Sequence, residues 1–387
     1  MNSASTPLDS NALASWVSGC AEVLSAALLV GFVTVALIRV VRIFAPGRLC
    51  DPSPGTGERE KNRKLQSEPV PLVGGLALIL GLLVLGSLSA NLGFQLLGWP
   101  WPGNFASSAA LFLAFAVGLL DDWLPQGLSP GRKFVGQCVA GLPLGYGMWF
   151  ALSGTFDSPT LALFGFLVVS AGLAAVAQNA INTFDNANGV ATGISAMAMA
   201  TCSPAAAGAL LGFLPFNLRA VSKSEHNKVS TPMAYLGDSG SHLLGMWILL
   251  TPLAWPVLTL PLIDLARLSV ERVRSGRSPF RGDRQHLAHL LAARGLSDHS
   301  VLSILAGIAA PSILLGTYGL RAGRFDWLLI GVGATLCAYF TFLLVIRFLG
   351  QATSEGKDRS ANTQGGVAEQ ASAYLPVKFE STEEIDK

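Results

Sequence analysis

The sequence predicts an all-α protein, a polytopic transmembrane bundle of about nine to eleven helices. Hydrophobic residues make up 51% of the 387 residues and charged residues only 13%, where a soluble domain carries about 25%. Long runs, such as residues 69–120, contain no charged side chain, and roughly 20 apolar residues suffice to cross a bilayer. The lipid bilayer is therefore the expected environment. A net charge of +2 gives no sign of a nucleic-acid partner.

The uncharged runs place the expected helices in order along the chain. The helices fall at about 20–42, 71–90, 105–121, 133–152, 159–179, 190–216, 239–263, 300–320 and 327–346. The tail, residues 350–387, is polar and of mixed charge. We expect this tail to be disordered and cytoplasmic, which leaves residues 1–349 as the integral membrane domain.

The basic residues set the expected orientation. They gather in three places, Arg39–Lys64, Arg132–Lys133 and Arg267–Arg294. Because cytoplasmic loops carry an excess of lysine and arginine, these loops are expected inside and the N-terminus outside. The helices between them then bring the Asp121–Asp122 pair and residues 178–189 to the cytoplasmic face.

Four groups of polar residues stand at the ends of these apolar runs. They are Asp121–Asp122 with Lys133; Asn179, Asn182, Asp185, Asn186 and Asn188; Asp238 within YLGDSGSHLLG; and Asp283, Arg284, His286 and His289. Ionisable residues at membrane helices are costly and by default mark a functional site. Taken singly, each group has a plainer interpretation, because a carboxylate at a helix end can be solvated or can cap the next helix.

Together the four groups indicate a site that handles phosphate at the cytoplasmic membrane surface. Carboxylates from separate segments suit Mg²⁺, which binds oxygen and is commonly shared with substrate phosphates. Lys133, Arg284 and the histidines supply cations for phosphate oxygens. His286 and His289 are three residues apart, so on a helix they lie on one face.

Five segments in this order resemble the polyprenyl-phosphate N-acetylhexosamine-1-phosphate transferases, or glycosyltransferase family 4. The more distant phospho-MurNAc-pentapeptide translocase is part of the same resemblance. The matching segments are EPVPLVGG, GLLDDWLPQGLSPGRKFVGQ, NAINTFDNANGVATG, YLGDSGSHLLG and SPFRGDRQHLAHLL, between about Pro71 and Ser297. Each segment alone is a weak signal, and the five in order are a strong one.

The resemblance implies a Mg²⁺-dependent enzyme of the bacterial inner membrane, with Mn²⁺ as the alternative ion. The enzyme would transfer N-acetylhexosamine-1-phosphate, with GlcNAc-1-phosphate expected, from a UDP-sugar to polyprenyl (undecaprenyl) phosphate. It would release UMP and begin the synthesis of a cell-envelope polysaccharide. Its active site would face the cytoplasm, and whether it forms a homodimer stays open.

The resemblance also implies roles for individual residues. Asp121 is the candidate for deprotonating the lipid phosphate, and the expected catalytic set is Asp121, Asp122, Asp185 and His286. The expected substrate-binding residues are Lys133, Asn179, Asn182, Asn188, Arg284 and His289. The expected metal ligands are Asp122, Asp185 and Asp238. The chain departs from the family pattern at Asn186, Asn188 and Ala288.

The spacing leaves two arrangements open between these motifs. The family places two crossings before the Asp238 motif, but the uncharged run 186–218 is short for two spans of about 20 residues each. A single helix would put Asp238 on the opposite side of the membrane. A compressed hairpin at 190–216, kinked near 202–204, keeps it inside, and the charges Arg219, Lys223 and Lys228 favour this arrangement. Likewise, residues 249–256 could break the run 239–263 into two pieces.

Two other functions stay open at this point. The short runs are compatible with a shortened, catalytically impaired relative of the family. A membrane transporter is the other alternative, because intramembrane charges also mark ion paths. A transporter would place its ionisable residues near mid-membrane, whereas here they stand at helix ends.

Overall fold

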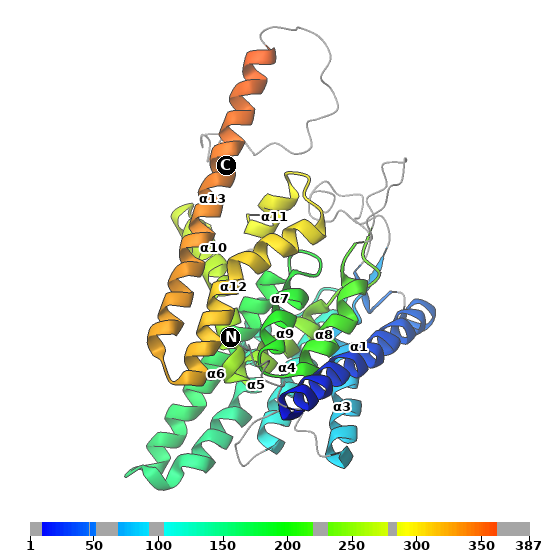
Figure 1. The fold of residues 1–387 in the computed structure, drawn as a ribbon, viewed down its shortest axis with the longest axis vertical. Coiled ribbons are helices and arrows are strands. Elements are labelled where there is room, and N and C mark those ends of the chain that lie inside the picture. The colour runs from blue at the N-terminus through cyan, green and yellow to red at the C-terminus, as the bar shows by residue number, and fades with distance from the viewer. Residues whose placement is uncertain are drawn as a thin grey trace, which may run out of the picture.

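The computed structural model describes residues 10–45, 47–51, 69–92, 104–219, 231–277 and 285–361. Across these ranges the chain is a bundle of twelve α-helices with one small antiparallel strand pair, β1 (Cys50–Asp51) and β2 (Val70–Pro71), shown in Figure 1. Seven helices are long and apolar enough to cross a membrane. The predicted helical class is confirmed.

The helices follow the expected order. The first six are α1 (Ser10–Phe44), α3 (Gly74–Leu92), α4 (Asn104–Trp123), α5 (Pro130–Leu152), α6 (Pro159–Phe184) and α7 (Val190–Ala200). The others are α8 (Pro204–Asn217), α9 (Gly237–Leu249), α10 (Thr259–Arg274), α11 (Leu287–Ala292), α12 (Asp298–Ala322) and α13 (Phe325–Ala361). The helix beyond the expected range of nine to eleven is the six-residue α11. Helix α13 continues past residue 349, where the tail was expected to begin, and residues 362–387 lie outside the described ranges.

The outer helices present large apolar side chains to their surroundings. Phe32 on α1, Phe112 on α4 and Leu161 on α6 are each more than 60% exposed. A water-soluble monomer rarely exposes apolar surface on this scale. These faces suit the acyl chains of a bilayer, and the protein is a multi-pass membrane protein.

The run 186–218 forms the compressed hairpin. Helices α7 and α8 have 11 and 14 residues, about 17 and 21 Å of helix, which is shorter than the bilayer core of about 30 Å. The turn lies where the sequence placed it, because Ser203 caps α8 and Pro204 occupies its first turn. The two ends of the hairpin meet, since the Asn217 side-chain oxygen accepts hydrogen bonds from the Gly189 N–H at 3.0 Å and the Thr192 hydroxyl at 3.1 Å. The alternative of a single crossing helix is wrong.

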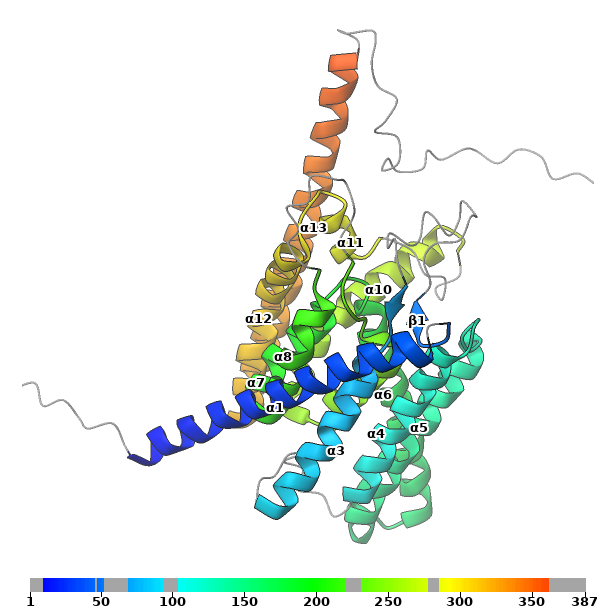
Figure 2. The ribbon, with the colours of Figure 1, turned by 90° about the vertical axis from the view of Figure 1, so that its right-hand side faces the viewer.

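The hairpin is held by α1, which lies obliquely across the bundle in Figure 2. Gly208 and Gly212 of α8 face α1, and a Cβ atom on either would collide with the backbone of Val23 or Ala27. Small residues four apart allow two membrane helices to approach at backbone distance. The short helices are therefore buried by protein and need not span the bilayer.

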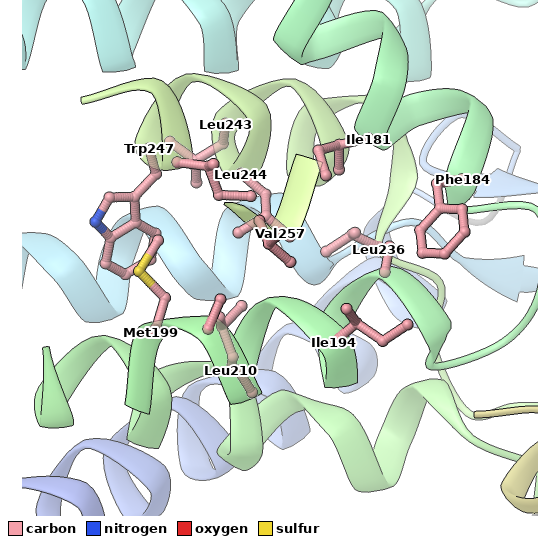
Figure 3. Close-up of a cluster of buried hydrophobic side chains, with 14 of the residues drawn as sticks. Ile181, Phe184, Ile194, Met199, Leu210, Leu236, Leu243, Leu244, Trp247 and Val257 are labelled. Carbon is pink, nitrogen blue, oxygen red and sulfur yellow. The ribbon is translucent and has the colours of Figure 1, made fainter. Parts of the chain in front are cut away.

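Helix α9 is the centre of the bundle. Figure 3 shows Leu243, Leu244 and Trp247 of α9 packed among apolar side chains of α6, α7 and α8, all of them fully buried. The run ends at Leu249 and is followed by the 3₁₀ turn Pro252–Leu258, so residues 239–263 are divided as the prolines indicated. Gly118 of α4 packs directly on the backbone at Asp238, which fixes the start of α9 against the end of α4.

Candidate active site

A cavity of about 820 Å³ opens where α4, α6 and α9 meet the β1–β2 pair. This volume is in the range of small-molecule sites. Its polar lining comes from segments far apart in the chain, namely Arg48, Asp51, Asp121, Asp122, Asn182, Asp185, Asn186, Asn188, Asn217, Tyr235 and Asp238. The structure therefore brings together most of the polar residues that the sequence selected.

Four aspartates and one lysine form what we call the acidic cluster: Asp121, Asp122, Asp185, Asp238 and Lys133. Asp121 and Asp122 occupy the last turn of α4, Asp185 directly follows α6, and Asp238 is the second residue of α9. All four aspartates line the cavity, and Lys133 lies next to it in the first turn of α5. Asp238 is thus on the same side as Asp121, as the hairpin requires.

Asp122 anchors one helix to another. One of its carboxylate oxygens accepts the backbone N–H of Asp238 at 2.9 Å, and the other accepts the N–H of Ser239 at 2.9 Å. The first N–H groups of a helix have no partner within the helix, and a carboxylate is favoured there by the helix dipole. Asp122 therefore caps α9 from the end of α4. Gly237, with φ of +76°, lies directly against this carboxylate.

Lys133 bridges two of the aspartates. Its Nζ atom lies 2.6 Å from Oδ2 of Asp238 and 3.2 Å from Oδ2 of Asp121. The other oxygen of Asp121 accepts the Leu128 N–H at 2.5 Å, within the turn between α4 and α5. A cation in the first turn of a helix opposes the helix dipole, so these carboxylates account for its position.

Asp185 is the aspartate of the cluster with the fewest hydrogen-bond and ion-pair partners. In the described part of the chain no donor forms a hydrogen bond with its side chain. Its removal from water raises its pKa well above the usual carboxyl range, and the charges of Asp238 and Asp122 raise the pKa further. Removal from water also opposes ionisation of Asp238, but a hydrogen bond with Asp121 and the Lys133 charge outweigh it and lower the pKa of Asp238.

The predicted asparagines divide into two sets. Asn182 and Asn188 line the cavity; Asn182 accepts a hydrogen bond from the Ser241 hydroxyl at 3.0 Å, and Asn188 donates to Asp298 at 2.9 Å. Asn179 instead lies outside the cavity lining and bonds Gln137 of α5 at 2.6 Å.

The Asp298 contact also holds the hairpin. The Asp298 carboxylate, at the start of α12, accepts hydrogen bonds from Arg219 Nε at 2.7 Å and from Arg219 Nη2 at 2.5 Å. Sequence reasoning missed Asp298, and it missed Gln137 and His242, whose side chains bond each other at 2.9 Å beneath the cluster. Gln137 and His242 stand within two of the matching segments, but no local pattern shows which residues these three contact, because their partners are 41 or more residues away.

The histidines do not line the cavity. The His286 Nδ1 atom lies 2.7 Å from the Asp264 carboxylate. The His286 and His289 rings are 6.2 Å apart, with His286 just before the first residue of α11. Arg284 lies outside the described residues. The structure thus separates these histidines from the acidic cluster.

His286 belongs to a second group that we call the α10–α13 network: Asp264, Arg267, Glu271, His286 and Tyr339. Asp264 accepts from the Tyr339 hydroxyl at 2.6 Å and from Arg267 at 3.0 Å, and Arg267 also bonds Glu271 at 2.9 Å. The sequence contains a signal for this network that was not used, because LIDLARL places the opposite charges of Asp264 and Arg267 three residues apart.

The donor chemistry of the cavity fits a hard divalent cation. Its walls carry carboxylate and amide oxygens, and the Asp185 carboxylate has no hydrogen-bond partner among the described residues. Mg²⁺ is held by oxygen ligands of this kind, together with water and substrate phosphates. No group of three or more histidine, cysteine or acidic side chains in those residues is already arranged around a common point. Asp122, Asp185 and Asp238 are therefore candidates that would complete their coordination with water or substrate.

The fold and the cavity define a multi-pass membrane protein whose acidic cluster is built from helix ends. Residues 104–255, which contain the whole cluster, match the model of glycosyl transferase family 4. This match agrees with the resemblance that the motifs indicate.

Several bacterial proteins are similar to the chain. It is 27% identical over 300 residues to the decaprenyl-phosphate N-acetylglucosaminephosphotransferase of Mycobacterium leprae, covering 63% of this chain and 72% of that protein. It is 28% identical over 311 residues to the undecaprenyl-phosphate alpha-N-acetylglucosaminyl 1-phosphate transferase of Haemophilus influenzae, covering 68% and 79%. The Escherichia coli K12 protein of the same name is 27% identical over 316 residues, covering 69% and 77%.

Proposed function

We propose that the chain transfers N-acetylglucosamine-1-phosphate from its UDP-sugar to polyprenyl phosphate, releasing UMP. The observation that carries the proposal is the convergence of four aspartates from three helix ends on one cavity, with Lys133 between two of them. The names of the similar bacterial proteins describe transfer of N-acetylglucosamine phosphate to decaprenyl or undecaprenyl phosphate. Arg48 lines the cavity, and Arg132 and Lys133 stand in the first turn of α5. Basic residues at this end of the helices favour the cytoplasmic face of a bacterial inner membrane.

The reaction explains why such a cluster is needed. An oxygen of the lipid phosphate forms a bond to the sugar-linked phosphorus, and the bond from that phosphorus to the UMP oxygen breaks. Both reactants are anions, so the site must position them and screen their repulsion. A bound Mg²⁺ would supply that screening and polarise the diphosphate.

Each member of the cluster has a distinct part in this proposal. Asp121, at the end of α4, takes the proton of the lipid phosphate. Asp185 and Asp238 would hold the metal ion, and Asp122 holds the start of α9 so that Asp238 faces the cavity. Lys133 fixes Asp121 and Asp238 relative to each other.

Two amides act on the substrates in this proposal. Asn182 and Asn188 offer hydrogen bonds to the UDP-sugar from the cavity wall. The roles of Asn179, Arg284, His286 and His289 in substrate binding stay predictions. Because His286 is held by Asp264 outside the cavity lining, we expect its replacement to cost less activity than that of Asp185.

The direct test is UMP release by purified chain given UDP-N-acetylglucosamine, polyprenyl phosphate and Mg²⁺. We expect release that requires the lipid and the metal ion. Asp185→Asn should lower it by at least about a hundredfold, since a ligand and its charge are lost. Asp326→Asn is the matched control, because Asp326 is an exposed aspartate that pairs only with Arg324. Silence with UDP-N-acetylglucosamine and with other UDP-sugars would indicate the impaired relative instead.

A further inference from the structure

The cavity has one cationic side chain on its wall. Arg48 is the sole lysine or arginine among the described lining residues, whereas five aspartates line the same space, Asp51, Asp121, Asp122, Asp185 and Asp238. Lys133 does not line the cavity, and its ammonium group already pairs with Asp121 and Asp238. Among the described residues, Arg48 is therefore the cation available to an anionic substrate that enters this cavity.

Arg48 is held in place without being neutralised. Its guanidinium carbon lies 5.2 Å from the centroid of the Trp123 ring, a cation–π contact. The following backbone is fixed, because Leu49 is buried and its carbonyl accepts the Leu72 N–H at 2.9 Å. No carboxylate of the described residues lies within ion-pair distance of Arg48, and no described residue accepts a hydrogen bond from its guanidinium.

The surroundings of Arg48 indicate the direction from which its ligand arrives. Arg48 follows α1, whose last residues, Ile43 and Phe44, are 69% and 78% exposed. On the other side, Trp123 ends α4 and is followed by the exposed Leu124. Exposed apolar residues beside a tryptophan are typical of the membrane–water boundary. The apolar residues beside Arg48 are therefore suited to contact lipid where the cavity opens next to it.

We propose that Arg48, oriented by Trp123, binds the phosphate group of the lipid substrate at this mouth of the cavity. The inference rests on the proposed function, since it assigns a contact to one of the two substrates. Arginine suits the role because its planar fork donates two parallel hydrogen bonds to one phosphate while its face stays stacked on an aromatic ring. The lipid chain would then leave the cavity along the apolar residues that end α1 and α4.

The test separates the two anionic substrates. UMP release is measured with polyprenyl phosphate varied at saturating UDP-sugar, and then with the reverse. Arg48→Ala should raise the KM for the lipid about tenfold or more, the loss expected for a charged hydrogen bond, and leave the KM for the UDP-sugar unchanged. Trp123→Leu should raise the lipid KM by less, and Arg48→Lys should retain part of the affinity.

Arg39→Ala is the matched control, because it removes the same charge from an exposed position on α1 and should change neither KM. Native mass spectrometry of polyprenyl phosphate retained by the full chain gives a readout without turnover, and Arg48→Ala should weaken retention about tenfold. The inference would be overturned if Arg48→Ala raised only the KM for the UDP-sugar, or if wild type and Arg48→Ala retained the lipid equally. Wild type that releases UMP would support the transferase in either case. Wild type that retains lipid through Arg48 but releases no UMP would contradict the proposed function alone.

Discussion

The acidic cluster and the α10–α13 network differ in how their charges are balanced. In the cluster, four aspartates face a cavity of about 820 Å³, and only two of them, Asp121 and Asp238, pair with Lys133. In the network, Asp264 and Glu271 are matched by Arg267 and by Arg347, and no residue of it lines that cavity. Balanced buried charges can serve to hold helices together, whereas an uncompensated group next to a cavity is suited to bind something. We therefore assign chemistry to the cluster and support to the network.

The largest effect is expected where the cluster loses its cation. Lys133→Met leaves Asp121 and Asp238 facing each other in a partly buried site. Breaking a fully buried ion pair costs about 3–5 kcal/mol of stability, which sets the upper limit here. Denaturation of the purified protein in detergent measures the loss. Arg324→Met is the matched control, because Arg324 pairs with Asp326 at the exposed surface and should show no measurable change. If the two variants were equally stable, the ion pairs of Lys133 would contribute no more to stability than the exposed Arg324–Asp326 pair.

The next effect concerns Asn188, where the chain departs from the family pattern. Its amide donates to Asp298 at 2.9 Å, so Asn188→Asp would place two carboxylates in contact. We expect kcat/KM for UMP release to fall about tenfold, the equivalent of about 1.4 kcal/mol. Adding Asp298→Asn restores a donor and an acceptor and should recover most of the loss. A double variant no better than the single one would show that this contact does not orient Asn188.

A smaller effect is expected in the network. Tyr339→Phe removes a hydroxyl that donates to Asp264 and accepts from Arg267. The loss should be about 1 kcal/mol of unfolding free energy, the net worth of a buried hydrogen bond. Kinetics on the same preparations should give kcat and KM values within about twofold of wild type. A large fall in kcat with unchanged stability would move the network into the catalytic machinery.

The smallest effect is a gain in stability and not a loss. Because the pKa of Asp185 is raised in the folded protein, the ionised side chain costs stability when no metal ion is bound. This cost is complete above the folded pKa and disappears as the pH falls below the pKa of an unfolded carboxyl, about 4. In EDTA, Asp185→Asn should therefore raise the Tm at pH 8 and raise it less at lower pH. A lower Tm for the variant at pH 8 would mean that Asp185 is compensated.

The sequence predicted the helices and much of the site because those signals are local. Uncharged runs gave the order of the helices, and the charges after residue 218 together with Pro204 predicted the hairpin that returns Asp238 to the side of Asp121. The same patterns placed Asp185 and Asn188 at the same membrane face as Asp121 and Asp122. The order of the motifs was enough to indicate the family.

Other parts of the site depend on contacts that no local pattern specifies. That Asp122 caps α9 follows from the packing of Gly118 against Asp238, 120 residues further along the chain. Arg48 was one basic residue among several in its loop, and only the folded chain places it on Trp123. His286 was selected by a motif that does not include Asp264, so its position outside the cavity was not foreseen.

Binding of Mn²⁺ to the purified chain in the presence of UDP, followed by electron paramagnetic resonance, tests the contrast between cluster and network most directly. The account predicts one Mn²⁺ per chain, with affinity at least about tenfold weaker in Asp185→Asn, the loss expected for a charged ligand. Asp264→Asn, which removes a carboxylate from the network, should bind the ion as wild type does. Unchanged affinity in Asp185→Asn, or a loss of affinity confined to Asp264→Asn, would contradict the assignment of the metal ion to the acidic cluster.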